Sequence, residues 1–597
     1  MERRDNEIAE TVVPLWIKNL IGVLIFLAPI KFGMTIGAGT PKIRQTFYEW
    51  LYSPFPQEMF IVGVFACLFL WFVSGVSRGI LRIRYSIFEL AILLFFASSV
   101  VSSLGAPNLY LSKIYLWHLA SCVVLFFVVF NTIEDEDDFK RYLNFIVGSA
   151  LFVVFYAIYQ KYFLLERTSD LIAQGYEKDA VLAGLIQQRI QSGRVFSTFI
   201  YPNALAGYLF LCLPVFICAI KVSGKNRRWI WILSTAAAAY ALYLTFYGEE
   251  LVKNVSETFN RRLEIWQAGF NMIKDFPIKG VGTYNFAALY SKYKIDIAEE
   301  VQTAHNNFLQ IFAEQGVVGF LAFCFLCLIV LSKGFATRGI LKGVFFAIIL
   351  FLIHNLVDFD WYVQGLAAMM WIFAGILLWG SGRYREKIFK CEFRSGKIIA
   401  ALAAAVLFTV SVNGQFKNIA ARYYLQLAVE AVNRKDFDKA GVLARKSMLY
   451  NRNNPAPYSL VAVAYAEGKE YLRAIDWLKD ALLRNKYCSP YYYSVGAYYL
   501  NLIQITGDLS LMPYAGWAFK KAVEYYPQNP LCRFQLARFY EANGQNSLAL
   551  KEYEYCLKLN ATIESEYKIR GKLLQQLLLP VGNLDVAKKV QKSSESS

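Results

Sequence analysis

The stretch QGLAAMMWIFAGILLWG, residues 364–380, contains no charged side chain. A helix needs about 20 mostly apolar residues to cross the hydrocarbon core of a bilayer, and this stretch approaches that length. Eleven such apolar runs predict membrane-spanning helices: 14–33, 58–76, 86–104, 113–131, 143–161, 203–220, 229–247, 316–332, 341–357, 364–380 and 397–412. The first run lacks a small-residue cleavage site, so we expect a retained span rather than a signal peptide. The hydrophobic content of 56% also favours a polytopic membrane protein.

Basic residues occur in alternate loops between these runs, and this alternation predicts the topology. The basic loops are 78–84, 221–228, 333–342 and 383–397. Cytoplasmic loops of membrane proteins are enriched in Lys and Arg, so these loops and the N-terminus are predicted to be cytoplasmic. The long loops 162–202 and 248–315, and everything after residue 412, then lie on the outer side. These loops account for much of the net charge of +17, so the expected partner is membrane lipid and not nucleic acid.

After residue 412 the long apolar runs stop and amphipathic helices follow. Three stretches resemble one another, and Pro455, Pro490 and Pro530 are predicted to end successive units. Their spacing is similar to the 34-residue period of tetratricopeptide repeats, whose helix pairs cover each other's apolar faces and form a concave surface. The concave surface is expected to hold a protein partner, with a spacer or dimerisation module as the alternative.

The fold prediction is therefore all-α. We expect a multispan membrane domain over residues 1–412, with about 11 spans and the two long outer loops. A tetratricopeptide-type α-solenoid over 413–580 and a disordered tail over 581–597 are predicted to follow.

Two predicted outer loops contain sequence motifs. RRLEIWQAGFNMIKDFPIKGVGTYNF, residues 261–286, predicts a helix that a proline and two glycines end. TAHNNFLQIFAEQGVVGF, residues 303–320, predicts a second helix entered near Thr303, with His305 on one of its faces. GRVFSTFIYPNALAGYL at 193–209 and HNLVDFDW at 354–361 are two further conspicuous stretches.

These motifs, taken in order, resemble the O-antigen ligase and polymerase family over about residues 60–380. The shared elements are Arg-x-Phe followed by Pro-Asn-x-x-Ala, Arg-x-x-x-Trp, Asp-x-Pro-x-x-Gly-x-Gly, and Ala-His-Asn-x-x-Leu with Glu-x-Gly after it. The resemblance implies a glycosyltransferase of the bacterial cytoplasmic membrane, with the repeats in the periplasm. Its donor would be a glycan on an undecaprenyl diphosphate carrier, and its acceptor a lipid A core sugar, a growing glycan or a protein. It also implies catalysis without a metal or another cofactor.

The residue types of the motifs suit this chemistry. A diphosphate leaving group needs positive charge, and the guanidinium fork of arginine matches phosphate oxygens. The attacking hydroxyl needs a proton acceptor, and histidine titrates near neutrality. We therefore predict His305 and Arg262 as catalytic residues. The predicted substrate-binding residues are Arg194, Arg261, Asn203, Trp266, Asn306 and Glu314.

Other interpretations of the same residues stay open. Arg194 and Arg262 could anchor loops on lipid headgroups, and Trp266 could be an interfacial packing residue. His118 and His354, in or near predicted spans, are expected to form hydrogen bonds between helices. The C-x-x-C pair Cys324 and Cys327 lies in an apolar run without further ligands, so we expect packing and not zinc binding.

Two other functions compete with glycan transfer. Family members commonly carry further hydrophobic passes before the Arg-x-x-x-Trp helix, whereas LTFYGEELVKNVSETFNRRLEIW follows at once here, so we expect that a helical hairpin is missing. A non-catalytic scaffold of a cell-envelope polysaccharide system is therefore the main alternative. A transporter is less favoured, because the polar motifs gather outside the spans and not at their midplane.

Overall fold

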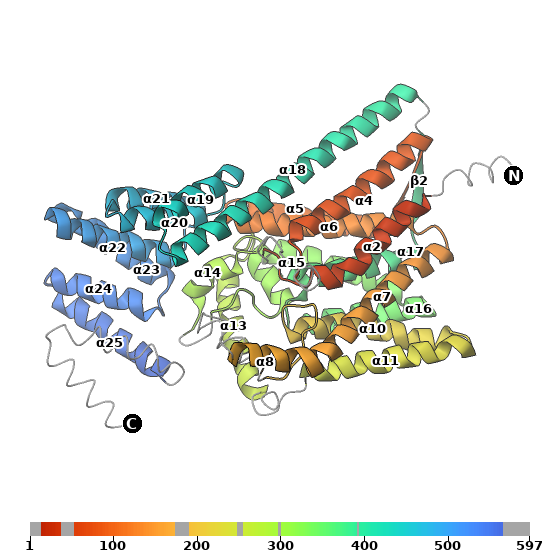
Figure 1. Cartoon of the computed structure of the whole chain (residues 1–597), viewed down its shortest axis with the longest axis horizontal. Coiled ribbons are helices and arrows are strands. Elements are labelled where there is room, and N and C mark those ends of the chain that lie inside the picture. The colour runs from red at the N-terminus through yellow and green to blue at the C-terminus, as the bar shows by residue number, and fades with distance from the viewer. Residues whose placement is uncertain are drawn as a thin grey trace.

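The computed structural model describes residues 13–37, 53–173, 190, 192–246, 255–295, 300–390 and 393–564. Regular structure in these ranges is almost entirely helical, which confirms the all-α prediction (Figure 1). Each predicted apolar run falls within one helix for most of its length. These helices are α2 (Leu15–Lys31), α4 (Gln57–Arg78), α5 (Ile87–Ser103), α6 (Leu109–Thr132), α7 (Glu136–Tyr159), α10 (Pro202–Val222), α11 (Lys225–Phe246), α15 (Asn307–Gly334), α16 (Ile340–His354), α17 (Gln364–Gly380) and α18 (Arg394–Asn433).

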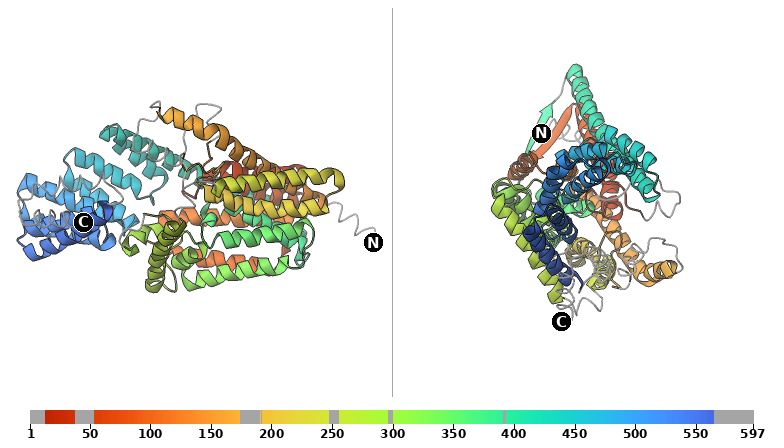
Figure 2. Two further views of the ribbon diagram at one scale, coloured as in Figure 1. Left: turned by 90° about the horizontal axis from the view of Figure 1, so that it is seen from below. Right: turned by 90° about the vertical axis from the view of Figure 1, so that its left-hand side faces the viewer.

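Seven helices of the described chain are long and apolar enough to cross a membrane, and α5, α16 and α17 are shorter apolar helices. These helices form one bundle, and the solenoid lies beyond one end of it, as two views of the molecule agree (Figures 1 and 2). The chain is therefore a multi-pass membrane protein. The stretch that opened the sequence analysis, α17, is buried on nearly all sides among its neighbours, as its lack of a polar face requires.

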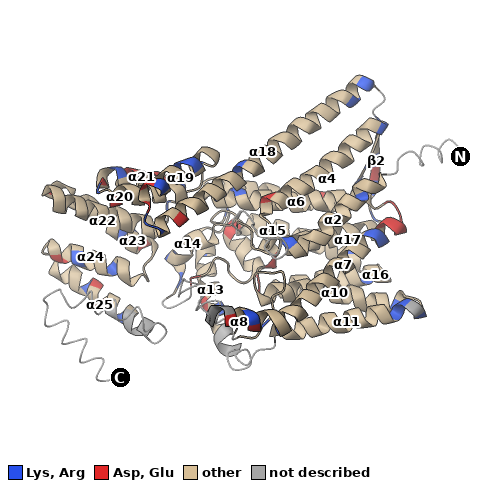
Figure 3. Ribbon diagram, viewed as in Figure 1, with Lys and Arg blue, Asp and Glu red and all other residues tan. Residues whose placement is uncertain are grey.

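The end of the bundle away from the solenoid carries many of its basic residues (Figure 3). Two of the basic loops pair there as antiparallel strands, β1 (Ile80–Tyr85) and β2 (Arg385–Lys390). Arg82 and Glu386 form an ion pair across this sheet at 2.6 Å. Both segments were expected to be loops, because an isolated two-stranded ribbon leaves only a weak pattern in sequence.

Helix α18 joins the bundle to the solenoid without a break. Its first half is mostly exposed in the isolated chain, as expected for a lipid-facing span, and its second half packs on the first repeat helix, α19 (Phe437–Tyr450). The helix therefore passes straight through the predicted domain boundary at 412–413. The division into domains stays a prediction.

The solenoid continues as antiparallel helix pairs. Its further elements are α20 (Ala456–Glu467), α21 (Tyr471–Arg484), α22 (Ser489–Thr506), η3 (Leu509–Leu511), α23 (Met512–Tyr525), α24 (Pro530–Ala542) and α25 (Asn546–Glu564). Pro455, Pro490 and Pro530 lie in or at the first turn of α20, α22 and α24, so they begin repeat units instead of ending them. The reason is that proline lacks an N–H, and the first turn of a helix is where that N–H has no helical partner.

Further helices, most of them short, fill the segments between the spans at the solenoid end. They are the π-helix η1 (Gln160–Leu164), α8 (Leu165–Ala173), α13 (Val255–Asp275), α14 (Phe286–Tyr293) and the 3-10 helix η2 (Asp360–Tyr362). The predicted tail, 581–597, lies outside the described residues.

Candidate functional site

A chain of hydrogen bonds connects three separate segments at the solenoid end of the bundle. Arg194 donates from Nη2 to Asn203 Oδ1 at 2.9 Å, and from Nε to the carbonyl oxygen of Thr245 at 2.6 Å. Asn203, in the first turn of α10, donates from Nδ2 to Asp358 Oδ2 at 2.8 Å. The structure thus brings the predicted residues Arg194 and Asn203 into direct contact, and it adds a buried carboxylate to them.

The loop that carries Arg194 is fixed by the beginning of the π-helix. The side-chain oxygen of Gln160 accepts hydrogen bonds from the backbone N–H groups of Phe196 at 2.9 Å and Ser197 at 2.8 Å. Lys161 donates to the carbonyl oxygen of Gly193 at 2.9 Å. Sequence reasoning missed both residues, although π-helical turns occur frequently at functional sites. The available signal was a Gln-Lys pair at the end of an apolar run.

His305 lies in the turn before α15 and not on the helix, which corrects the predicted helix start near Thr303. Asn306 is the N-cap, and its Oδ1 accepts a hydrogen bond from the Leu309 N–H at 3.0 Å, so the helix begins at residue 307. His305 itself has a positive φ of 48°. Its ring packs edge-to-face on Phe359 at 4.9 Å, and Tyr201 packs on the same Phe359 ring at 4.9 Å. These contacts connect His305 to the segments of the hydrogen-bond chain.

Helix α13 approaches the histidine turn through Trp266. The indole donates from Nε1 to the carbonyl oxygen of Ala304 at 3.0 Å, next to His305 in sequence. Arg262 precedes Trp266 by one helical turn and so lies on the same face of α13. Arg262 is half-buried, whereas Arg261 is exposed and projects from a different direction of the helix.

The two predicted phosphate-binding arginines lie close enough to affect each other electrically. Burial lowers the pKa of the Arg194 guanidinium, the Asp358 carboxylate opposes this effect, and the positive charge of Arg262 lowers the pKa further. Two like charges near one another repel, and an anion between them removes this unfavourable energy. The arrangement therefore suits an anionic group at this place.

Glu314 serves the structure of the outer loops. Its buried carboxylate accepts hydrogen bonds from the backbone N–H groups of Tyr284 at 2.7 Å and Phe286 at 3.2 Å. It also accepts from Gln310 Nε2 at 3.1 Å and from the Tyr362 hydroxyl at 2.8 Å. These four partners turn the carboxylate towards the glycine-containing segment. Its predicted role in substrate binding stays a prediction.

The Gly-x-Gly and Glu-x-Gly motifs interlock beside this carboxylate. Gly316 kinks α15 with φ 65° and ψ −169°, and a Cβ there would lie 2.1 Å from the carbonyl oxygen of Ile278. Gly280 also has a positive φ of 72°, and a Cβ on it would lie 2.3 Å from the Glu314 backbone. Only glycine tolerates both the conformation and the close approach. The motif glycines therefore set the shape of the loops.

A second acidic residue lies beside Asp358 in the loop between α16 and α17. Asp360 is buried, and its Oδ2 pairs with His354 Nδ1 at 2.7 Å. Its carboxylate rests on Gly207 of α10, where a Cβ would come within 2.1 Å of Oδ2. His354, which was predicted to bond between helices, thus ends α16 and pairs with the carboxylate that begins the 3-10 helix η2.

The comparisons with known proteins cover two parts of the chain. The O-antigen ligase family model matches residues 195–324, which include Asn203, Arg262 and His305, and a tetratricopeptide repeat model matches residues 518–551. No curated protein matches the sequence significantly.

Among solved structures, a crystal structure of MamA is 18% identical to this chain, with a TM-score of 0.22. The match covers 29% of this chain and 94% of the MamA chain. MamA 41-end from Desulfovibrio magneticus RS-1 is 16% identical to this chain, with a TM-score of 0.22, and the match covers 28% of this chain and 89% of that MamA chain. A chain of the APC/C hetero-tetramer Cut9-Hcn1 is 10% identical to this chain, with a TM-score of 0.22, and the match covers 84% of this chain and 95% of that chain. The two family models confirm the resemblance inferred from the motifs: residues 195–324 are similar to the O-antigen ligase family, and residues 518–551 are similar to a tetratricopeptide repeat.

Proposed function

We propose that the chain transfers a glycan from an undecaprenyl diphosphate carrier to an acceptor hydroxyl at the outer face of the bacterial cytoplasmic membrane. The match to the O-antigen ligase family supports a membrane glycosyltransferase. The acceptor would be a lipid A core sugar, a growing glycan or a protein, and the tetratricopeptide repeats favour a protein partner or acceptor.

The convergence of three motif segments carries this proposal. Arg194, fixed by Asn203 and the Thr245 carbonyl, lies within electrostatic reach of Arg262. His305 packs on Phe359, next in sequence to the carboxylate that Asn203 holds. These contacts support a site in which two cations and an imidazole act around one region at the end of the bundle. A scaffold would require none of these three side chains.

The residues would act as follows. His305 accepts the proton of the acceptor hydroxyl while its oxygen bonds to the anomeric carbon of the donor sugar. The bond from that carbon to the diphosphate oxygen breaks, and undecaprenyl diphosphate leaves with the electron pair. Arg262 and Arg194 stabilise the negative charge that develops on the leaving diphosphate. The positive φ of His305, Ser197 and Tyr284 marks three strained turns around this region, a feature that is common at functional sites.

The orientation is part of the proposal. The basic residues at the opposite end of the bundle favour a cytoplasmic position for that end and a periplasmic position for the candidate site and the repeats (Figure 3). A reporter enzyme that is active only after export, fused after Ser597, should be active. Activity of a cytoplasm-only reporter at this position would contradict the orientation.

The decisive experiment is glycan transfer by the purified full chain from a lipid-linked donor. His305→Ala and Arg262→Ala should each reduce the rate by a factor of about a hundred or more, because each removes a group that acts in the transition state. Arg262→Lys should recover only part of the rate, since lysine lacks the bidentate fork. Exposed Arg261→Ala is the matched control on the same helix, and a smaller loss is expected. Full activity of the His305→Ala variant would exclude His305 as the base, whereas absence of transfer by the unmodified chain would favour the scaffold alternative.

A further inference from the structure

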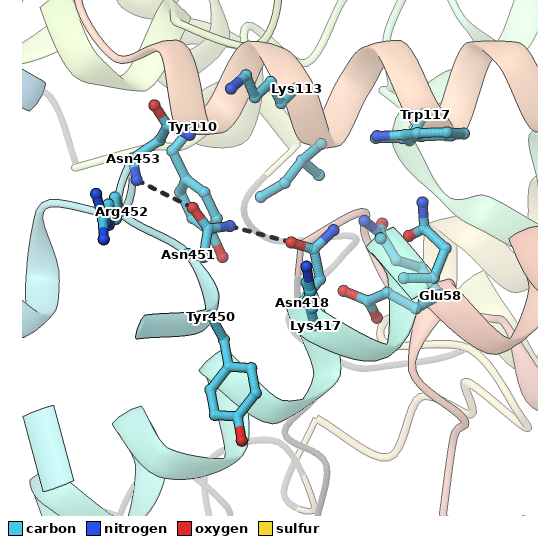
Figure 4. A pocket seen from close by; sticks show the side chains of 14 residues that line it. Glu58, Tyr110, Lys113, Trp117, Lys417, Asn418, Tyr450, Asn451, Arg452 and Asn453 are labelled. Atoms are coloured by element: carbon cyan, nitrogen blue, oxygen red, sulfur yellow. Dashed lines mark hydrogen bonds between the residues drawn. The ribbon is translucent and has the colours of Figure 1, made fainter. Parts of the chain in front are cut away.

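A cavity of about 250 Å³ lies where the bundle meets the first helices of the solenoid (Figure 4). It is separate from the region around His305. Its walls are the first turn of α4, the first two turns of α6, the middle of α18 and the turn that follows α19. Asn451 in that turn donates to Asn418 of α18 at 3.0 Å and accepts from the Asn453 N–H at 3.0 Å, which fixes one wall.

The charges around this cavity are mainly positive. Lys113 comes from α6, Lys417 from α18 and Arg452 from the turn after α19, so three elements each contribute one exposed cation (Figure 4). The one acidic residue among the lining residues, Glu58, is already paired with Arg422 at 3.3 Å. The cavity therefore presents an excess of positive charge to a ligand.

Two buried polar atoms of the lining have no hydrogen-bond partner within the described part of the chain. They are Glu58 Oε2 and Gln415 Nε2, on side chains that are 3% and 1% exposed. Buried polar atoms without partners are rare and costly in folded proteins. One of these atoms accepts a hydrogen bond and the other donates one. A ligand that carries hydroxyl groups can satisfy both.

We propose that this cavity binds a phosphate ester that bears free hydroxyl groups. The cations would hold the phosphate, and Glu58 and Gln415 would bind the hydroxyls. A volume of 250 Å³ lies just below the range of about 300–1,000 Å³ for drug-sized ligands, so a headgroup fits better than an extended glycan. This inference does not rest on the proposed glycan transfer.

The position of the cavity favours a membrane lipid as the source of this phosphate. It lies at the beginning of α4 and α6, where these spans are expected to leave the bilayer, and Trp117 of α6 lines it; tryptophan is enriched near that interface. Basic pockets between membrane helices bind anionic headgroups. Phosphatidylglycerol combines a phosphate diester with two hydroxyls. A soluble phosphorylated sugar offers the same chemistry, and the experiment separates the two sources.

The test uses the purified full chain in an uncharged detergent. The probes are short-chain phosphatidylglycerol, short-chain phosphatidylcholine and glucose 1-phosphate, with binding measured by calorimetric titration. The test variant is Lys113→Gln with Lys417→Gln, and the control is Lys439→Gln with Lys551→Gln, two exposed lysines of the solenoid. Each basic residue near an anionic headgroup contributes about 1 kcal/mol, so the test variant should bind phosphatidylglycerol about 30-fold more weakly. The control variant should bind it like the unmodified chain.

The outcomes discriminate clearly. Phosphatidylglycerol binding that the test variant loses supports the proposal with a lipid source. Binding of glucose 1-phosphate that the same variant loses supports it with a soluble source. Equal binding by the test variant and the unmodified chain would overturn it, as would phosphatidylcholine binding as tightly as phosphatidylglycerol. Arg452→Gln, in an exposed turn, is the second variant should the first fail to fold, and weaker binding is expected there too.

Discussion

The outer loops of the bundle and the repeats of the solenoid reach stability in opposite ways. In the outer loops, buried polar groups bond to one another and to the adjoining helices: Tyr362 donates to Glu314 at 2.8 Å, and Thr283 bonds to Ser103 at 2.6 Å. In the solenoid, the buried side chains are mostly alanines and aromatics, such as Ala518 and Phe519. A polar network needs each particular partner, whereas an apolar core needs volume and shape.

This contrast suits the two proposed tasks. A site that binds a charged donor needs side chains whose positions are fixed by specific hydrogen bonds. A solenoid needs regular helix pairs that expose a concave surface, and each pair depends mainly on its neighbours. We therefore expect single substitutions in the outer loops to have larger and more specific effects than substitutions in the repeats.

The largest effect is expected for Glu314→Ala. The change leaves four donors without their acceptor: two backbone N–H groups, Gln310 and Tyr362. Each unsatisfied buried donor costs about 1–3 kcal/mol, so the local opening free energy of residues 281–290 should fall by about 4–12 kcal/mol. Hydrogen exchange measured by mass spectrometry reports this quantity. Glu314→Gln keeps an acceptor oxygen for two of the four donors and turns an NH2 towards the other two, so it should lose less than Glu314→Ala; an equal loss would mean that the loop needs both carboxylate oxygens.

The next largest effect is expected for Phe519→Ala in the solenoid. Phe519 is fully buried and packs against Gly496 and Phe539. Removing a buried phenylalanine ring costs about 3–5 kcal/mol. Hydrogen exchange should rise in α22 to α24 while residues 281–290 stay protected, because the repeats transmit strain mainly to their neighbours. Leu483→Ala, at a side chain that is 81% exposed, is the control with little expected change. A loss of protection in the outer loops would contradict the independence of the two regions.

The contrast between a polar network and regular apolar repeats also explains how well each region could be predicted from the sequence. Apolar runs and a 34-residue period are local patterns, so the spans and the repeats could be predicted from them. The buried face of α13 could not: Leu263 and Phe270 are exposed, and Ile265, Ala268 and Met272 are buried. Both sets recur at helical spacing, and only tertiary packing chooses between them.

The candidate site was predictable in its residue types but not in its connections. The motifs identified Arg194, Asn203 and His305, and the structure joins them through Asp358 and Phe359 from a distant segment. Such contacts depend on how the helices assemble, which no spacing within one motif encodes. The same holds for Gln160, whose amide fixes the Arg194 loop from the end of another helix.

A smaller effect is expected for Gly316→Ala, which tests the interlocked motif turns. Alanine at a positive φ is strained, and its Cβ would meet the Ile278 carbonyl oxygen. Strain of this kind costs about 1–3 kcal/mol, so we expect a loss of about 2–3 kcal/mol in the local opening free energy of residues 276–284. Gly224→Ala, where a Cβ has no neighbour within 4 Å, should change little. Unchanged protection in the Gly316 variant would show that the turn relaxes without cost.

The smallest effect is expected at the contact between the two regions, where Lys294 meets the solenoid. Lys294 Nζ donates to the Tyr526 hydroxyl at 3.2 Å and pairs with Glu300 at 2.6 Å, and the Tyr526 hydroxyl also bonds to Glu300. Tyr526→Phe removes the hydroxyl but keeps the ring on which the ammonium rests at 5.0 Å. Glu300 is exposed, and exposed ion pairs contribute little, so the change should cost less than about 1 kcal/mol in the protection of α14 and α23. Tyr526→Ala also removes the cation–π contact and should cost somewhat more. If Tyr526→Phe lowered this protection by several kcal/mol, the solenoid and the outer loops would form one cooperative unit. The contrast between the two regions would then describe their composition but not their folding.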